Sequence, residues 1–340
     1  GEYVDEIAAA IDGATAMDDG ELADRGIAMM IERIGGTLER MGVTIDTWFS
    51  ERTLLSDGRF ERVLAALAET GHSYEHDGAM WLRTTDFGDD KDRVLRRTNG
   101  EYTYFATDIA YHADKRARGF ERLIDVWGAD HHGYVARMKA AFEALGGDPD
   151  AFEPVIMQLV NLVEGGRNVQ MGKRSGEFVT VDDLIDDIGV DALRFFMVQR
   201  SHDTAMDLDV ALAREQSDKN PVYYVQYAHA RIASILRKAG ERPGPPAALG
   251  HRLHASERAL IRRLIEFPDE IAETCARRAP HRLTIYGRDL AAEFSAFYRD
   301  CKVVGEDDVV QDFRVALCRA TRETLARTLW LLGVSAPDSM

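Results

Sequence analysis

Residues 123–134 read LIDVWGADHHGY, a run of strand-forming residues followed at once by glycines and polar side chains. The apolar and β-branched run at 123–127 predicts a β-strand. A helical pattern follows over residues 133–145, and a second apolar run at 155–160 predicts another strand. Strand, helix and strand in this order are typical of a parallel sheet in an α/β domain.

The same alternation extends toward the N-terminus, where residues 102–106 (YTYFA) favour a strand and residues 108–119 a helix. Residues 1–70 carry helical patterns separated by glycines, which we interpret as connecting helices. After Ser217 the patterns are helical to the C-terminus, apart from the proline-rich linker ERPGPPA at 241–247. We therefore predict an α/β part followed by an all-helical bundle of about 120 residues.

Composition and cysteine usage place the chain among ordinary globular proteins, with 45% hydrophobic and 29% charged residues. The longest apolar runs, such as TLWLLGV at 328–334, are too short to span a bilayer. No basic and apolar leader opens the sequence, so we expect a cytoplasmic protein without a membrane partner. Cys275, Cys301 and Cys318 form no CxxC pair, and we expect buried thiols rather than disulfides or a zinc site.

The net charge of −16 argues at first against a nucleic-acid partner, because Lys and Arg supply most of the affinity for phosphates. The excess of acidic residues, however, lies in residues 1–215, since residues 216–340 carry slightly more basic than acidic side chains. Basic side chains gather within about thirty residues of the C-terminal part: Arg258, Arg262, Arg263, Arg277, Arg278, His281, Arg282 and Arg288. By itself, such a run is better explained by a solvated helix face than by RNA binding.

Polar side chains follow the predicted strands, where open parallel sheets bind their ligands. Asp108 follows the first strand and either caps the next helix or receives a cationic group of a substrate. In GADHHGY, Gly128 permits the close approach of a ribose whose hydroxyls donate to Asp130. His131 and His132 are adjacent and point in different directions, which argues against a shared metal ion.

A further cluster, VQMGKRSGEFV at 169–179, places a Lys-Arg pair between two glycines. Gly172 and Gly176 let the backbone turn sharply and approach an anion, while Lys173 and Arg174 supply positive donors. The loop lacks the GxxxxGK[ST] spacing of a phosphate cradle, so the residues alone also allow a solvated turn.

Together these clusters resemble the class I arginyl-tRNA synthetases. The elements that carry the resemblance are GAMWLR at 78–83, FGDDKDRV at 87–94, YFATD at 104–108, GADHHGY at 128–134, the KMSKR-like QMGKR at 170–174, FVTVDDLIDDIGVDALR at 178–194, NPVYYVQYAHAR at 220–231, FYRDCKV at 297–303 and LLGVSAPDSM at 331–340. Each motif is weak by itself, but their order and separations are specific.

The resemblance implies three domains. Residues 1–175 correspond to the second half of a class I Rossmann-like catalytic domain, with connecting helices over about 1–75. Residues 176–215 correspond to stem helices after the KMSKR-like loop, and residues 216–340 to a helical anticodon-binding domain.

The resemblance also implies roles for individual residues. Arginine binding falls to Tyr104 and Asp108, whose carboxylate pairs with a guanidinium, and to His132, although the choice between His131 and His132 stays open. Lys173 and Arg174 take the catalytic role of stabilising charge on the ATP phosphates. The remaining ATP-binding positions are Gly128, Asp130, His131, Met171 and Gly172. The tRNA-binding positions are Tyr224, Gln226, Tyr227, Arg231 and Tyr298.

A member of this family activates L-arginine with ATP to arginyl-adenylate and transfers it to tRNA(Arg). We therefore expect ATP with Mg²⁺ as a substrate, no tightly bound cofactor, no metal site and a monomer. The loop departs from the family pattern at Gln170 and Gly172, where the family has Lys and Ser.

The sequence also lacks an HxGH motif, the class I element that binds ATP. We therefore expect the C-terminal portion of a synthetase that is inactive by itself. The alternative is a non-catalytic RNA-binding or regulatory module.

Overall fold

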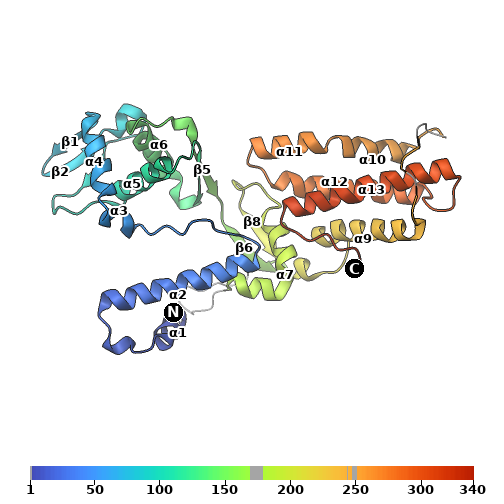
Figure 1. The fold of residues 1–340 in the computed structure, drawn as a ribbon, viewed down its shortest axis with the longest axis horizontal. Coiled ribbons are helices and arrows are strands. Elements are labelled where there is room, and N and C mark those ends of the chain that lie inside the picture. The colour runs from blue at the N-terminus through green and yellow to red at the C-terminus, as the bar shows by residue number, and fades with distance from the viewer. Residues whose placement is uncertain (1, 169–178, 243, 247–250) are drawn as a thin grey trace. The chain divides into compact units, whose positions relative to one another are not determined.

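The computed structural model describes residues 2–168, 179–242, 244–246 and 251–340 (Figure 1). The chain forms two compact units. We name the two units by their order along the chain. The inner unit comprises Asp46–Leu159 and His202–Thr204, and the outer unit comprises the flanking segments Gly1–Ile45, Val160–Ser201 and Ala205–Met340. The domain limits predicted at 175 and 215 follow the family pattern rather than these contacts, and they remain predictions.

The inner unit combines helices with a three-stranded antiparallel sheet of order β1-β2-β3 and a two-stranded parallel sheet of β4 and β5. Its elements are α3 (Arg52–Ser56), α4 (Arg59–Glu69), β1 (Ser73–His76), β2 (Ala79–Leu82), the 3₁₀ turn η2 (Thr84–Phe87), β3 (Arg93–Arg96), α5 (Tyr104–Ala117), β4 (Leu123–Gly128), the 3₁₀ turn η3 (Ala129–Tyr134), α6 (Val135–Ala144), the 3₁₀ turn η4 (Pro149–Ala151) and β5 (Phe152–Met157).

The parallel pairing predicted between the strand at 123–127 and the next strand of the chain is confirmed. β4 and β5 run in parallel from Leu123 opposite Phe152 to Gly128 opposite Met157, and α6 connects them. The second strand, predicted over 155–160, is instead two strands, because β5 ends at Met157 and β6 begins at Val160.

The strand predicted at 102–106 is wrong, because α5 already begins at Tyr104. Thr103 caps this helix: its side chain accepts from the backbone nitrogen of Ala106 and donates to the carbonyl oxygen of Val94 at 2.8 Å. A threonine in this position satisfies one of the free N–H groups of the first helical turn. Asp108 consequently lies inside the helix and does not cap it.

One hydrophobic core holds the inner unit together. α4 buries Phe60, Leu64 and Leu67, whose spacing places them on one helix face, and α5 buries Phe105 and Ile109 against them. This packing holds α5 against α4, and other residues of α5 line two cavities.

The outer unit combines helices with a three-stranded sheet of order β7-β6-β8, in which β6 and β8 are parallel. Its elements are α1 (Glu2–Ala10), the 3₁₀ turn η1 (Ala14–Ala16), α2 (Asp19–Arg40), β6 (Val160–Glu164), β7 (Arg167–Asn168), α7 (Val181–Met197), β8 (Met206–Asp209), α8 (Val210–Arg214), α9 (Pro221–Ala239), α10 (Ala255–Ile265), α11 (Phe267–Ala276), α12 (His281–Asp300) and α13 (Asp308–Leu331).

The helical bundle predicted after Ser217 is confirmed by α9 to α13 (Figure 1). Asn220 caps α9, and its side-chain oxygen accepts from the backbone nitrogen of Val222 at 3.2 Å. Cys301 and Cys318 are buried as predicted, and burial raises the pKa of Cys318 to about 12, whereas Cys275 is exposed. Within the described ranges, no helix is long and apolar enough to cross a membrane.

Candidate active site and nucleic-acid interface

A cavity of about 360 Å³ lies among α5, β4 and η3 in the inner unit. Residues spaced three, four and seven positions apart share one face of a helix, and α5 turns such a face toward this cavity. The lining side chains that carry charge, polar atoms or aromatic rings are Asp108, Tyr111, His112 and Lys115 from α5, Asp125 and Trp127 from β4, and His131 and Tyr134 from η3.

The carboxylate of Asp125 is largely buried in this cavity, where it forms an ion pair with Lys115 and lies beside the ring of His112. The Nε2 atom of His112 and the Nζ atom of Lys115 each lie 2.7 Å from a carboxylate oxygen of Asp125. The other ring nitrogen of His112 lies 2.7 Å from the carbonyl oxygen of Asp108, so both partners of His112 are acceptors. Burial opposes ionisation of Asp125, but hydrogen bonds from His112 and Lys115 hold its pKa below the usual carboxyl value.

Asp108 differs from Asp125 because its partner is neutral. The hydroxyl of Tyr134 donates to Oδ2 of Asp108 at 2.6 Å. Among the described residues, no basic side chain forms an ion pair with Asp108. The carboxylate of Asp108 is therefore not bound by a cationic side chain of the described residues, and the aromatic rings of Tyr111 and Trp127 line the same cavity. A carboxylate beside aromatic rings suits a planar cation such as a guanidinium.

The structure does not bring every predicted arginine-binding residue to this cavity. Tyr104 is the first residue of α5, its side chain is 85% exposed, and it does not line the cavity. His131 lines the cavity and His132 does not, so the geometry favours His131 over the predicted His132.

Of the predicted ATP-binding residues in GADHHGY, Gly128 ends β4 and Asp130 lies in η3. A Cβ atom at position 128 would lie 2.7 Å from Oδ1 of Asp130, so a side chain there would displace this exposed carboxylate. Gln170, Met171, Gly172, Lys173 and Arg174 lie outside the described residues, and their roles stay predictions. In the part of the chain that the structure describes, no group of three or more side chains could hold a metal ion.

Four residues of this cavity were not predicted as site residues from the sequence: His112, Lys115, Asp125 and Tyr134. His112 and Lys115 follow Asp108 by four and seven residues, so helical spacing alone places them on the same face. Asp125 is hidden in the strand pattern LIDVW, where a carboxylate gives no sign of its partners.

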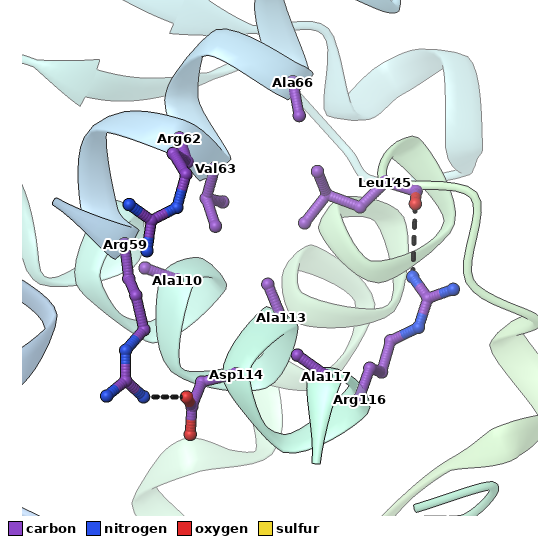
Figure 2. Close-up of a pocket in the computed structure, with 10 residues that line it drawn as sticks. All are labelled: Arg59, Arg62, Val63, Ala66, Ala110, Ala113, Asp114, Arg116, Ala117 and Leu145. Atoms are coloured by element: carbon purple, nitrogen blue, oxygen red, sulfur yellow. Dashed lines mark hydrogen bonds and ion pairs between the residues drawn. The ribbon is translucent and has the colours of Figure 1, made fainter. Parts of the chain in front are cut away.

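A second cavity, of about 530 Å³, lies between α4 and the face of α5 formed by Ala110, Ala113 and Ala117 (Figure 2). The guanidinium groups of Arg59, Arg62 and Arg116 surround its apolar wall. Figure 2 shows Arg59 paired with Asp114 and Arg116 donating to the carbonyl oxygen of Leu145, at 3.1 Å. This basic rim disfavours a cationic ligand, so the cavity at Asp108 is the candidate site for one.

An exposed group of aromatic and cationic side chains lies on α9 and α12 in the outer unit. The rings of Tyr223 and Tyr227 are stacked, with centroids 6.1 Å apart and an interplanar angle of 10°. The guanidinium carbon of Arg231 lies 5.7 Å from the ring centre of Tyr227 and 4.7 Å from that of Tyr298. Tyr227 is 43% exposed and Tyr298 is 39% exposed. We call Tyr227, Arg231 and Tyr298 the aromatic platform.

Next to the platform is a cavity of about 320 Å³, which Tyr223, Tyr224, Tyr227 and Arg231 help to line. Three of the five predicted tRNA-binding residues thus form one surface, and Tyr224 borders it. Gln226 points elsewhere: it is buried, and its amide donates to Asp191 at 2.8 Å, so its place in the fold counts against contact with tRNA.

Several arginines of the basic run between Arg258 and Arg288 form ion pairs with acidic side chains of the bundle. Arg263 pairs with Asp289, Arg277 with Glu273 and Arg282 with Glu270. A phosphate would have to compete with these carboxylates or share their arginines. The platform is therefore the stronger candidate for nucleic-acid contact.

Two family models match the chain. The model described as tRNA synthetases class I (R), catalytic domain, matches residues 27–229, and the model described as DALR anticodon binding domain matches residues 225–340.

Curated relatives and solved structures agree with these models. An arginine–tRNA ligase of Geobacillus kaustophilus is 48% identical over 322 residues, covering 93% of this chain and 58% of that protein. That of Desulforudis audaxviator is 51% identical over 312 residues, covering 89% and 55%. A Campylobacter jejuni structure described as an arginyl-tRNA synthetase superposes with a TM-score of 0.90 at 33% identity, covering all of this chain and 76% of that one. The chain thus spans less than two thirds of the length of these curated relatives.

Proposed function

The chain belongs to the class I arginyl-tRNA synthetase family, and from this premise we propose that it is part of an ATP-dependent arginine–tRNA ligase. We propose that it binds the side chain of L-arginine in the cavity at Asp108. In the proposed reaction, the carboxylate of L-arginine attacks the α-phosphorus of ATP, pyrophosphate leaves, and the arginyl group then passes to tRNA(Arg). Mg²⁺ enters with ATP as part of that substrate.

The uncompensated charge of Asp108 is the observation that carries this proposal. A guanidinium donates two parallel N–H groups, and a carboxylate accepts both. Asp125 lies in the same cavity but already binds His112 and Lys115, so Asp108 alone offers its charge to a ligand. A carboxylate that is not bound by a cationic side chain and lies beside aromatic walls is suited to a planar cation.

The other substrates have proposed contacts as well. Gly128 and Asp130 stand at the carboxyl end of β4, where a ribose could approach the glycine and donate its hydroxyls to the carboxylate. Lys173 and Arg174 are proposed to contact the triphosphate and stabilise charge that develops during adenylate formation. A monomer in the cytoplasm is part of the same proposal, because ATP, L-arginine and tRNA are available there.

The aromatic platform is proposed to bind unstacked bases of the tRNA anticodon loop. Single-stranded RNA is commonly held by bases stacked on aromatic rings and guanidinium planes. Tyr227, Arg231 and Tyr298 present both kinds of surface on the part of the chain that the DALR model matches.

Substitution of Asp108→Asn in the gene product that contains residues 1–340 tests the arginine site. Removing one member of a desolvated charge pair costs about 2–5 kcal/mol, so the dissociation constant for L-arginine should rise at least thirtyfold, while that for ATP changes little. Asp150→Asn, which removes an exposed charge in η4 of the same unit, is the matched control.

Both dissociation constants can be measured by titration calorimetry, and adenylate formation by arginine-dependent exchange of pyrophosphate into ATP. If Asp108→Asn lowered the affinities for L-arginine and for ATP by the same factor, the result would count against the arginine site. Wild-type protein that binds tRNA but neither L-arginine nor ATP would identify a non-catalytic RNA-binding module instead.

A further inference from the structure

The hydrogen bond between Tyr134 and Asp108 joins two parts of the inner unit. Tyr134 is the last residue of the turn η3, and Asp108 lies in the second turn of α5. Their separation of 2.6 Å between the hydroxyl and Oδ2 is that of a good hydrogen bond to a carboxylate.

The ring of Tyr134 is held by its neighbours. Its centroid lies 6.2 Å from that of Phe105 and 5.9 Å from that of Trp127, both in edge-on contact. The guanidinium carbon of Arg137 lies 4.8 Å from the ring centre. A ring enclosed in this way cannot turn its hydroxyl away from Asp108 without disturbing several contacts.

The hydroxyl of Tyr134 keeps its proton. Burial, followed by the hydrogen bond to Asp108, raises the pKa of Tyr134 far above the usual tyrosine value. Tyr134 therefore donates to Asp108 throughout the physiological pH range, and it does so as a neutral group.

The contrast with Asp125 shows what a neutral donor achieves. His112 and Lys115 fix the carboxylate of Asp125, but the ammonium group of Lys115 also compensates its charge. Tyr134 occupies one acceptor position on Oδ2 of Asp108 and leaves the charge and the remaining acceptor positions of the carboxylate available.

We propose that Tyr134 is a positioning residue for substrate binding, whose neutral hydroxyl fixes the Asp108 carboxylate for the guanidinium group of L-arginine. The proposal rests on the arginine site proposed above. Without the hydroxyl, Asp108 has to be ordered by the ligand itself, and ordering a free side chain weakens binding by about five- to tenfold.

The variant Tyr134→Phe removes only the hydroxyl, and we expect it to raise the dissociation constant for L-arginine about five- to tenfold without changing that for ATP. The control is Tyr74→Phe, because Tyr74 also donates to a carboxylate of the inner unit, that of Asp92 at 2.8 Å, and does not line the cavity. The control should leave the affinity for L-arginine unchanged, and the melting temperatures of the two variants show whether each is folded.

A double-mutant cycle separates positioning from general structural damage. If Tyr134 acts through Asp108, then Tyr134→Phe should cause little further loss in an Asp108→Asn background. An unchanged affinity in Tyr134→Phe, or the same loss in both backgrounds, overturns the positioning role. An Asp108→Asn variant with wild-type affinity for L-arginine overturns the arginine site itself, so the two failures can be told apart.

Discussion

Removal of the Tyr227 ring should weaken tRNA binding without weakening the fold. Tyr227 is 43% exposed and stacks on Tyr223, so a base that contacts the exposed part of its ring loses this support in Tyr227→Ala. Base stacking on one aromatic side chain contributes about 1–3 kcal/mol, which corresponds to an increase in the dissociation constant of roughly five- to 150-fold. Because much of the ring is exposed, we expect the free energy of unfolding to fall by about 1 kcal/mol or less.

Salt dependence distinguishes stacking from charge in the same platform. Tyr227→Ala removes no charge, so the slope of log K against log salt concentration should stay unchanged, whereas Arg231→Gln should lower its magnitude by about one if Arg231 contacts a phosphate. Fluorescence titration of the chain with tRNA(Arg) at several salt concentrations measures both quantities.

Trp330 offers a matched control for this experiment. It is 66% exposed on α13, and the guanidinium carbon of Arg327 lies 5.3 Å from its ring centre, so it repeats the aromatic and cationic pairing outside the platform. Equal losses in Trp330→Ala and Tyr227→Ala would refute a specific role for the platform, as would an affinity of Tyr227→Ala equal to that of the wild type.

Two further predictions concern stability. Thr103→Ala removes the cap of α5 and its bond to β3, and should cost about 1–2 kcal/mol in urea unfolding; an unchanged midpoint would contradict the capping role. Burial of Glu257 opposes its ionisation, but hydrogen bonds from Arg314, His254 and His251 lower its pKa in the folded state. Its stabilising contribution is therefore complete above the unfolded value of about 4.3 and is lost as pH falls through the lower folded value, so Glu257→Gln should reduce the loss of stability below pH 4. Thermal unfolding between pH 3 and pH 7 would contradict this if wild type and variant lost stability in parallel.

The sequence predicted those elements for which the local amino-acid composition and the packing in the folded chain favour the same secondary structure. LIDVW is rich in apolar and β-branched residues, Leu123 is buried, and the whole segment pairs with β5, so β4 formed where its composition indicated. YTYFA has an equally strong preference for strand, yet Thr103 within it starts a helix, because a cap depends on one side chain and not on average composition. The bundle after Ser217 was predictable because helical spacing persists over each of its long helices.

The candidate site was predictable only in part. Asp108 stood out through the resemblance to a family, and its helix places His112 and Lys115 beside it by spacing alone. The choice between His131 and His132 depends on how a 3₁₀ turn directs adjacent side chains, which no periodicity reveals. The different partners of Asp108 and Asp125 could not be predicted from the sequence. Asp125 belongs to β4, and only the three-dimensional structure shows that it contacts His112 and Lys115 of α5.

The inner unit interrupts the outer unit, and this sets the order in which the two can fold on a ribosome. No residue of α2 is buried, and its C-terminal end is held by α7: the hydroxyl of Thr37 donates to Asp182 at 2.5 Å, and Arg40 pairs with Asp182 and Asp186. These partners follow α2 by 142–146 residues in the chain. At about 5–20 residues per second, α2 waits roughly seven to thirty seconds for α7, and nearly all of the inner unit has been synthesised by then. Nascent chains should therefore show a protease-resistant inner unit while α2 is still cleavable.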